Sequence, residues 1–216
     1  MTHLFLTSSI EIQGIGESIR NHLGHNRVLK TAFILTPSEG DANQDDLSWV
    51  DGERSRLNAN NFVTFDYTIT GKSIDQIQNE LKDIDVMYVT GGNEFYFKEK
   101  CNKSGFKQFV QDFVNSGKPY ISSSAGSIIV GHDMSALLNL SDTSKHPQPL
   151  DVTGLGIVDF TILPHWGSDN FKAEWLSKES FEYMYKSKSP LIALNNFEYI
   201  EVIDEQYRII DVRNKK

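Results

Sequence analysis

Short apolar runs of strand length alternate with stretches of helical periodicity along most of this chain. We expect strands at 2–6, 31–35, 62–65, 86–89, 120–122, 160–163 and 191–194, and helices at 10–22, 45–60, 74–82, 95–100, 107–115 and 171–186. The stretch 74–82 shows the helical pattern well, because Ile74, Ile77 and Leu81 fall on one face. Such alternation, with strands that are apolar almost throughout, is typical of a mostly parallel sheet covered by helices on both faces. The predicted fold class is therefore α/β, a three-layer α/β/α sandwich.

The C-terminal segment departs from this alternation. Residues 199–203 and 207–212 flank a short polar link and are predicted to form an antiparallel hairpin. The 216 residues contain no Pro/Gly/Ser-rich linker and no internal repeat, so we expect a single domain over 1–216. The polar stretch 141–149 is the best candidate for a long mobile loop.

Composition excludes several classes of function. A net charge of −8, from 21 basic and 29 acidic residues, argues against a nucleic-acid partner. No apolar run approaches the roughly 18 residues of a membrane span, and the N-terminus does not read as a signal peptide. Cys101 is the only cysteine, and the histidines show no metal-ligand spacing. We therefore expect a soluble cytoplasmic protein without membrane partner, metal or cofactor. The composition is compatible with a homo-oligomer.

An apolar run that ends in three serines is the strongest chemical signal of the chain. Residues 120–130 read Tyr-Ile-Ser-Ser-Ser-Ala-Gly-Ser-Ile-Ile-Val. A strand that turns sharply into a helix can hold a serine hydroxyl where backbone N–H groups face a developing oxyanion. Ser122 and Ser123 compete with Ser124 for this position, and a serine that only caps a helix would look the same. Ser124 is thus the candidate nucleophile of a hydrolase.

Three further features follow predicted strands: Gly91-Gly92-Asn93-Glu94, Pro164-His165 and Asn195-Asn196. In an open parallel sheet the binding crevice lies outside the carboxyl ends of the strands, so these features share one expected location with Ser124. A double glycine lets backbone N–H groups approach a ligand closely, although it can equally be a tight turn. A lone histidine is more often structural than catalytic. Their common position makes coincidence less probable than any single motif would.

Taken in order, Gly91-Gly92-Asn93-x-Phe95, Ser123-Ser124-Ala125-Gly126 and Pro164-His165 resemble the aspartyl dipeptidase (peptidase E) family of serine peptidases, which includes cyanophycinases. The resemblance covers most of the chain. It implies a fold similar to that of class I glutamine amidotransferases, with the nucleophile at a strand–helix elbow. The implied activity is that of a serine peptidase with an acyl-enzyme mechanism, acting on a small peptide as a dipeptidase does.

The same resemblance implies a role for each matching residue. Ser124 would attack the substrate carbonyl, and His165 would accept its proton and return it to the leaving amine. The backbone N–H groups of Gly92 and Ala125, with Gly91 as a further candidate, would form the oxyanion hole.

The chain departs from the family pattern at three places. The family has a glutamate as third triad member where this chain has Asn196, so the orienting residue is Asn196, the nearby Glu198, or neither. A small residue usually follows Gly-Gly-Asn, whereas this chain has Glu94, which makes Asn93 and Glu94 candidate substrate-binding residues. The resemblance implies an arginine just after the serine elbow that recognises the substrate carboxylate. No arginine occurs between Ala125 and Trp166, which argues against a preference for N-terminal aspartate. Because the acid is missing, the alternative function is a catalytically weak or inactive small-molecule or peptide-binding protein on the same fold.

Overall fold

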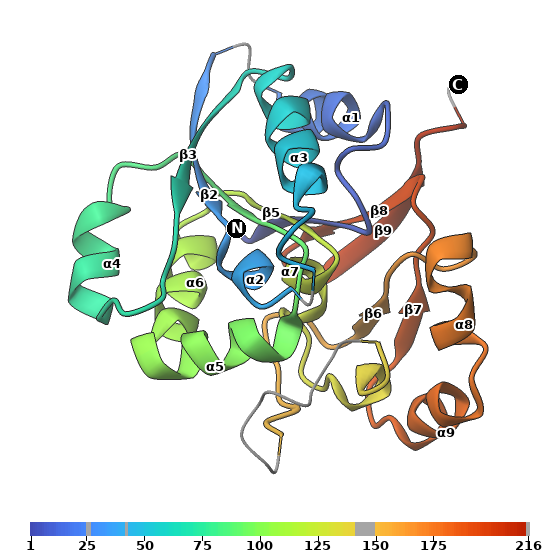
Figure 1. The fold of residues 1–216 in the computed structure, drawn as a ribbon. Coiled ribbons are helices and arrows are strands. Elements are labelled where there is room, and N and C mark those ends of the chain that lie inside the picture. Colours follow the sequence, from blue (N-terminus) through green and yellow to red (C-terminus); the bar gives the residue numbers. More distant parts are fainter. Residues whose placement is uncertain (25–26, 42, 141–149, 215–216) are drawn as a thin grey trace.

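A seven-stranded sheet forms the centre of the molecule (Figure 1). The structure is a computed structural model that describes residues 1–24, 27–41, 43–140 and 150–214, so the candidate loop 141–149 lies outside the described residues. The strand order is β3-β2-β4-β5-β1-β8-β9. Its strands are β1 (His3–Thr7), β2 (Leu29–Ile34), β3 (Phe62–Tyr67), β4 (Val86–Val89), β5 (Tyr120–Ser123), β8 (Glu198–Ile203) and β9 (Gln206–Asp211). β1 to β5 are mutually parallel, and β8 and β9 form the expected antiparallel hairpin, with β8 paired to β1.

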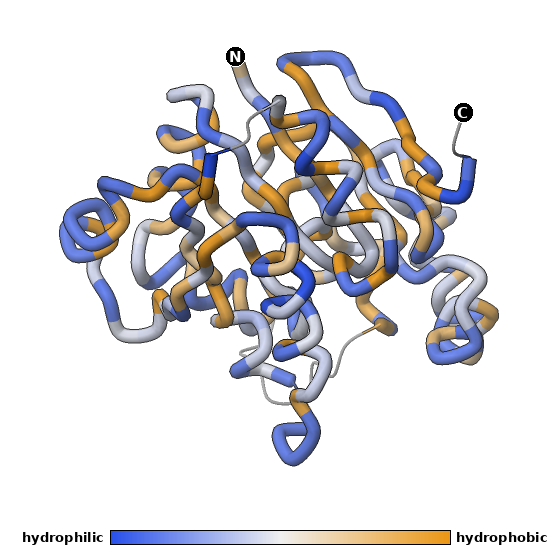
Figure 2. Tube along the Cα trace, turned by 90° about the horizontal axis from the view of Figure 1, so that it is seen from above, coloured by the Kyte–Doolittle hydropathy of each residue, from blue (hydrophilic) through white to orange (hydrophobic). Residues whose placement is uncertain are grey.

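Helices cover both faces of this sheet. One face carries α1 (Ile15–His22) and α3 (Ser48–Asn58), and the other carries α4 (Ile74–Glu80), α5 (Glu94–Ser104) and α6 (Phe106–Asn115). An apolar cluster fills each interface, and side chains alternate between the two: Tyr88 of β4 packs toward α1 and α3, whereas Val89 packs toward α5. Hydrophobic segments accordingly gather in the middle of the molecule (Figure 2). The prediction of a three-layer sandwich is confirmed, and burial on both faces explains the unbroken apolar strands.

A smaller unit lies beside the carboxyl ends of the sheet, and the short helix α2 (Thr36–Glu39), which follows β2, stands apart from it. β6 (Thr161–Leu163) and β7 (Leu191–Ala193) pair in parallel as a separate two-stranded sheet. Around them lie η1 (Ser135–Leu137), η2 (Asp169–Phe171), α8 (Lys172–Trp175) and α9 (Lys178–Lys186). No helix in the described ranges has the length and apolar character that crossing a membrane requires.

The largest departures from the predicted helix boundaries occur in two helices. The helix expected at 10–22 begins only at Ile15, because Gly14 before it has a φ of 95°, which a helix interior does not allow. The helix expected at 171–186 is divided into η2, α8 and α9. Ser177 has an extended backbone, and its hydroxyl accepts from the Ser180 amide at 3.0 Å, so it starts a new helix.

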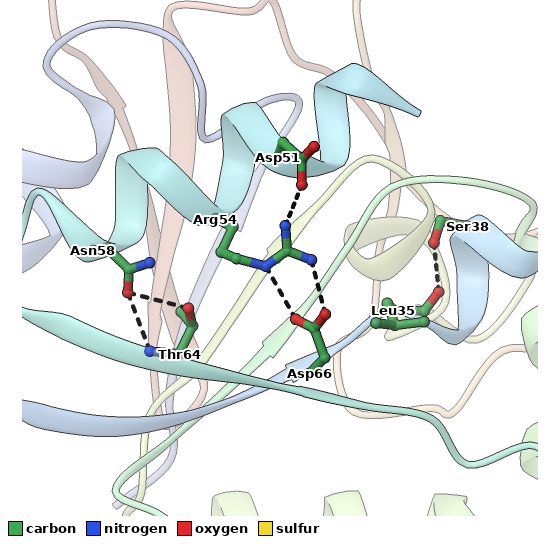
Figure 3. Close-up of polar contacts among 7 residues, drawn as sticks. All are labelled: Leu35, Ser38, Asp51, Arg54, Asn58, Thr64 and Asp66. Carbon is green, nitrogen blue, oxygen red and sulfur yellow. Dashed lines mark hydrogen bonds and ion pairs between the residues drawn. The ribbon is translucent and has the colours of Figure 1, made fainter. Parts of the chain in front are cut away.

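Side-chain contacts fix α3 on the edge strand β3 (Figure 3). The Arg54 guanidinium donates to both carboxylate oxygens of Asp66, at 3.0 and 3.1 Å, and also pairs with Asp51. Asn58 Oδ1 accepts from the amide and the hydroxyl of Thr64, at 3.2 and 3.1 Å. These bonds set the position of α3 along the strand, and with it the position of the side chains that α3 turns toward the cavity described next.

Candidate active site

The chain segments that follow β4, β5 and β6 meet at one cavity. Gly91 and Gly92 follow β4, Ser124 follows β5, and His165 follows β6. All four line a cavity of about 410 Å³. For β4 and β5 this is the location expected from the carboxyl ends of parallel strands. The strand before His165, β6, lies instead in the separate two-stranded sheet, yet His165 lines the same cavity.

Ser124 occupies a sharp turn between β5 and α7 (Ala125–Ile128). Its φ of 45° and ψ of −111° are unusual for a residue with a side chain. The turn is held from both sides, because the Ser124 amide donates to Thr7 O at 3.0 Å and its carbonyl accepts from the Ser127 amide at 2.8 Å. Gly126 is required beneath it, since a Cβ there would lie 2.6 Å from Val89 O. Backbone strain of this kind is characteristic of nucleophile elbows.

The two competing serines point elsewhere. Ser122 Oγ is hydrogen-bonded to Ser127 Oγ at 2.8 Å. Ser123 Oγ accepts from the Ile10 amide at 3.0 Å and bonds to the Tyr88 hydroxyl at 2.8 Å. Both are buried within the sheet, whereas Ser124 is partly exposed and lines the cavity. Among the three, Ser124 is the serine that a substrate can reach.

A chain of two hydrogen bonds connects Ser124, His165 and Asn196. His165 Nδ1 lies 2.8 Å from Asn196 Oδ1, and His165 Nε2 lies 3.0 Å from Ser124 Oγ. Because a carbonyl oxygen only accepts, Nδ1 must carry the proton, and in the neutral ring Nε2 is then free to accept from the serine hydroxyl. The arrangement presents an unprotonated nitrogen to Ser124, as a general base requires.

The imidazole of His165 is held on several sides. Its ring stacks on Phe171, with 4.5 Å between centroids and 8° between planes. Its backbone amide donates to Ser8 Oγ at 3.1 Å, and Ser8 Oγ donates to Leu194 O at 2.8 Å. Burial lowers the pKa of His165, and the bond to Asn196 acts in the opposite direction. The lowered pKa favours the neutral ring, the form that can take a proton.

Glu198, the other candidate partner of the histidine, is engaged in its own turn. Its Oε2 accepts from the Asn195 backbone amide at 3.1 Å. The structure therefore places Asn196, and not Glu198, against the His165 ring.

Backbone amides face the cavity beside Ser124. Gly92 has a φ of 126°, and a Cβ there would lie 2.3 Å from Pro37 O, so only glycine fits. Across the described part of the chain, the amides of Gly92 and Ala125 donate to no backbone acceptor. The Gly91 amide instead interacts with the Glu53 carboxyl group. Gly92 and Ala125 are thus better placed than Gly91 to receive an oxyanion.

The candidate substrate-binding residues lie at the start of α5. Asn93 Oδ1 accepts from the amides of Phe95 and Tyr96, at 3.0 and 2.9 Å, and so caps the helix. Asn93 and Glu94 are both buried, and both line the cavity. The cap accounts for Asn93 structurally, and a role of either residue in substrate binding stays a prediction.

Several cavity residues were not singled out in the sequence, among them Glu11, Trp49 and Glu53. The signal for Glu53 was present, because Val50, Glu53 and Leu57 share the buried face of α3 and a carboxylate is out of place there. Burial raises the pKa of Glu53 to about 8, and the charge of Glu11 acts in the same direction. A buried carboxyl group with a displaced pKa in a cleft is a frequent mark of a functional site.

Comparison with known proteins gives one consistent family. The model of peptidase family S51 matches residues 4–210. An uncharacterized peptidase of Listeria monocytogenes, Lmo0363, is 28% identical over 201 residues, which cover 93% of this chain and 94% of that protein. Peptidase E of Shewanella sp. (strain ANA-3) is 34% identical over 95 residues, which cover 43% of this chain and 37% of that protein.

A solved structure has the same fold. The crystal structure of a "Putative Peptidase E Protein" from Listeria monocytogenes EGD-e superposes with a TM-score of 0.83 at 22% identity, covering 98% of both chains. Because the match covers nearly all of both chains, the fold expected from the sequence is also the fold of that protein.

Proposed function

The chain belongs to peptidase family S51, and we propose that it is a serine peptidase that cleaves small, dipeptide-like substrates with Ser124 as nucleophile. The observation that carries the proposal is the hydrogen-bonded series Ser124–His165–Asn196, at 3.0 and 2.8 Å, on the wall of a cavity. A cavity of about 410 Å³ suits a small ligand better than a folded protein chain.

The geometry supports an acyl-enzyme mechanism. His165 Nε2 removes the proton of Ser124 Oγ as the oxygen attacks the carbonyl carbon of the scissile bond. The tetrahedral oxyanion is received by the amides of Gly92 and Ala125. The protonated ring then donates to the leaving amine, and the acyl-enzyme forms. Water, deprotonated by the same nitrogen, hydrolyses the acyl group and restores Ser124.

Asn196 acts on the orientation of the ring and not on its charge. By accepting from Nδ1 it selects the tautomer that leaves Nε2 open. An amide carries no net charge, so it stabilises the imidazolium of the transition state less than a carboxylate would. We expect slower turnover than in a peptidase with an acid at this position.

The test is hydrolysis of a dipeptide and isoaspartyl-dipeptide library, read by mass spectrometry. Wild type should cleave members of the library, and Ser124→Ala should cleave none while keeping its thermal unfolding curve. Ser116→Ala, at the exposed end of α6, serves as matched control and should behave as wild type. A serine-directed phosphonate should add its mass to Ser124 alone. Equal cleavage by wild type and Ser124→Ala would refute the assignment.

The second candidate function is a binding protein of the same fold with little or no turnover. The amide of Asn196 in place of an acid is the observation that favours it. It predicts that library members bind to wild type and to Ser124→Ala alike and are cleaved by neither protein. The same experiment therefore distinguishes the two functions.

A further inference from the structure

The cavity beside Ser124 is acidic. Four carboxyl residues line it, namely Glu11, Asp41, Glu53 and Glu94, and within the described ranges neither lysine nor arginine does. A substrate carboxylate bound among them would find no lysine or arginine in the described lining to pair with, and any ionised carboxyl group there would repel it. The lining therefore favours a substrate group that is positively charged.

Among the described residues, Glu53 has one oxygen without a donor, although its carboxyl group also interacts with the hydroxyl groups of Ser123 and Tyr88. The residue is 3% exposed, it lines the cavity, and within the described chain its Oε2 has no hydrogen-bond partner. A buried carboxylate oxygen without a donor is costly to a fold, and an apolar side chain beside Val50 and Leu57 would avoid that cost. A ligand with N–H donors would satisfy the oxygen.

This acceptor lies close to the reacting serine. The Glu53 carboxyl group interacts with the Gly91 amide. A Cβ on Gly91 would lie 3.4 Å from Ser124 Cβ and 3.4 Å from Cζ3 of Trp49, so Glu53, Trp49 and Ser124 surround the same glycine. The Glu11 carboxylate rests on the α3 backbone at Gly52, where a Cβ would collide with its Oε1. Two carboxyl groups and an indole thus share one side of the cavity.

We propose that Glu53 and Glu11 form a subsite for an alkylammonium group of the peptide substrate, flanked by the indole of Trp49. The inference rests on the proposed peptidase function, because it assigns the recognition of the substrate that Ser124 attacks. An ammonium group has three donors for the open oxygen of Glu53 and its neighbours, and its charge offsets that of the two acids. An aromatic face beside such a cation is favourable.

Two parts of a peptide carry this chemistry. The α-ammonium group of the N-terminal residue lies one carbon away from the carbonyl that Ser124 would attack, and a lysine side chain at that residue is longer and reaches further. A metal ion is a poorer occupant, because the described residues include no group of three or more His, Cys, Asp or Glu side chains arranged to hold one.

The protonation of Glu53 gives the subsite a second measurable property, the release of a proton when a ligand binds. Burial raises the pKa of Glu53 to about 8, so at pH 7 most empty sites hold a neutral carboxyl group. A bound ammonium group favours the carboxylate and expels that proton. The other charged or titratable groups that act on this pair or line the cavity are Tyr88, Arg56, Asp41, Glu94 and His165. Binding of a cation at pH 7 should therefore release a proton.

The experiment measures binding separately from turnover, by calorimetry on Ser124→Ala at pH 7. The ligands are Ala-Ala, N-acetyl-Ala-Ala, Lys-Ala and norleucyl-Ala. If the α-ammonium group is bound, acetylation weakens Ala-Ala binding about 10- to 100-fold. If the lysine side chain is bound, Lys-Ala binds more tightly than norleucyl-Ala by a similar factor. Adding Glu53→Gln should remove whichever difference is seen, together with the proton release measured in buffers of different ionisation enthalpy.

Glu174→Gln is the matched control. Glu174 also has a buried carboxylate oxygen without a partner in the described chain, but it lies outside the cavity, so binding should be unchanged. Glu11→Gln should weaken the binding of the same ligands as Glu53→Gln does. If a thermal melt shows that Glu53→Gln does not fold, the affinities of Glu11→Gln test the subsite instead. Equal binding of charged and uncharged ligands, absence of binding by every free amine, or affinities unchanged by both substitutions would overturn the subsite. Absence of hydrolysis by wild type would contradict the peptidase function and leave these affinities standing.

Discussion

At the scale of single residues, the partner of His165 decides how the candidate base behaves. Asn196 Oδ1 fixes the ring through Nδ1 at 2.8 Å without adding charge. Burial meanwhile lowers the pKa of the imidazole. A general base works only when unprotonated, so activity should be lost as the pH falls through the pKa of His165.

Replacing Asn196 by aspartate should move this limit. A carboxylate beside Nδ1 stabilises the imidazolium, so Asn196→Asp should raise the pKa of His165. The acidic limb of kcat/KM reports this pKa, which burial lowers in the wild type, so in the variant the limb should shift to higher pH. Profiles between about pH 4 and 9 measure the shift. Asn195→Asp, whose side chain caps its own turn by accepting from the Phe197 amide, is the control and should shift the limb less. A limb that stays in place or moves to lower pH would contradict the role of Asn196.

At the scale of elements, the elbow between β5 and α7 positions the candidate nucleophile because several contacts hold its strained backbone. Ser124 keeps a φ of 45° only while Thr7, Ser127 and the closely packed Gly126 hold the turn. The same close packing makes the element sensitive to one methyl group.

Gly126→Ala should damage both stability and activity. Its Cβ would lie 2.6 Å from Val89 O and 2.8 Å from Val89 Cγ1, so β4 and α7 must separate. Such overpacking typically costs about 1–3 kcal/mol, and a displacement of about 1 Å at Ser124 lowers kcat about a hundredfold. Urea unfolding and kinetics measure the two effects. Gly71→Ala, at a φ of 76° with no neighbour within 4 Å, should lose about 1 kcal/mol and keep its activity. Full activity in Gly126→Ala would show that the elbow tolerates the shift.

At the scale of the whole molecule, the buried acid of the cavity should make the fold pH-dependent. The carboxyl group of Glu53 titrates near 4.5 in an unfolded chain and near 8 in the folded protein, because burial disfavours its charge. Between these values the native state holds the extra proton, so the contribution of Glu53 to stability is highest at the acidic end of this range and falls as the pH rises. The buried carboxyl group of Glu53 therefore lowers the stability of the fold at neutral and higher pH, although it lines the cavity.

Glu53→Gln should remove this dependence. Relative to wild type, the variant should gain free energy of unfolding as the pH rises from about 4.5 to about 8, by a total on the order of 4 kcal/mol. Denaturant unfolding at several pH values measures the difference, in which the other titrating groups cancel. Glu11→Gln should show a difference of the same sign, because burial also raises the pKa of Glu11. A difference that is independent of pH, or that has the opposite sign, would contradict a neutral Glu53 in the folded protein.

Most of the architecture could be predicted from local pattern. The strands of the main sheet and the C-terminal hairpin were found where apolar runs meet turn residues, because a sheet buried on both faces leaves little freedom in composition. The location of Ser124 and Gly92 followed from one topological rule, that parallel strands end at a common edge. His165 reaches the same cavity from β6, which lies in the separate two-stranded sheet, so that rule did not predict its place. The division of the helix expected at 171–186 was not foreseen, since Ser177 ends one helical pattern and starts another within a continuous periodicity.

The sequence by itself determined the fold class, the family and the strand ends at which Ser124, His165 and Asn196 stand, because these depend on local residue patterns. The tertiary structure alone decided which serine faces the cavity, that Asn196 and not Glu198 meets the histidine, and that Glu53 joins the site from another layer. Those contacts join residues far apart in the chain, across a sheet and a helix packed upon it. Periodicity records which face of an element is buried, but not which neighbour it is buried against.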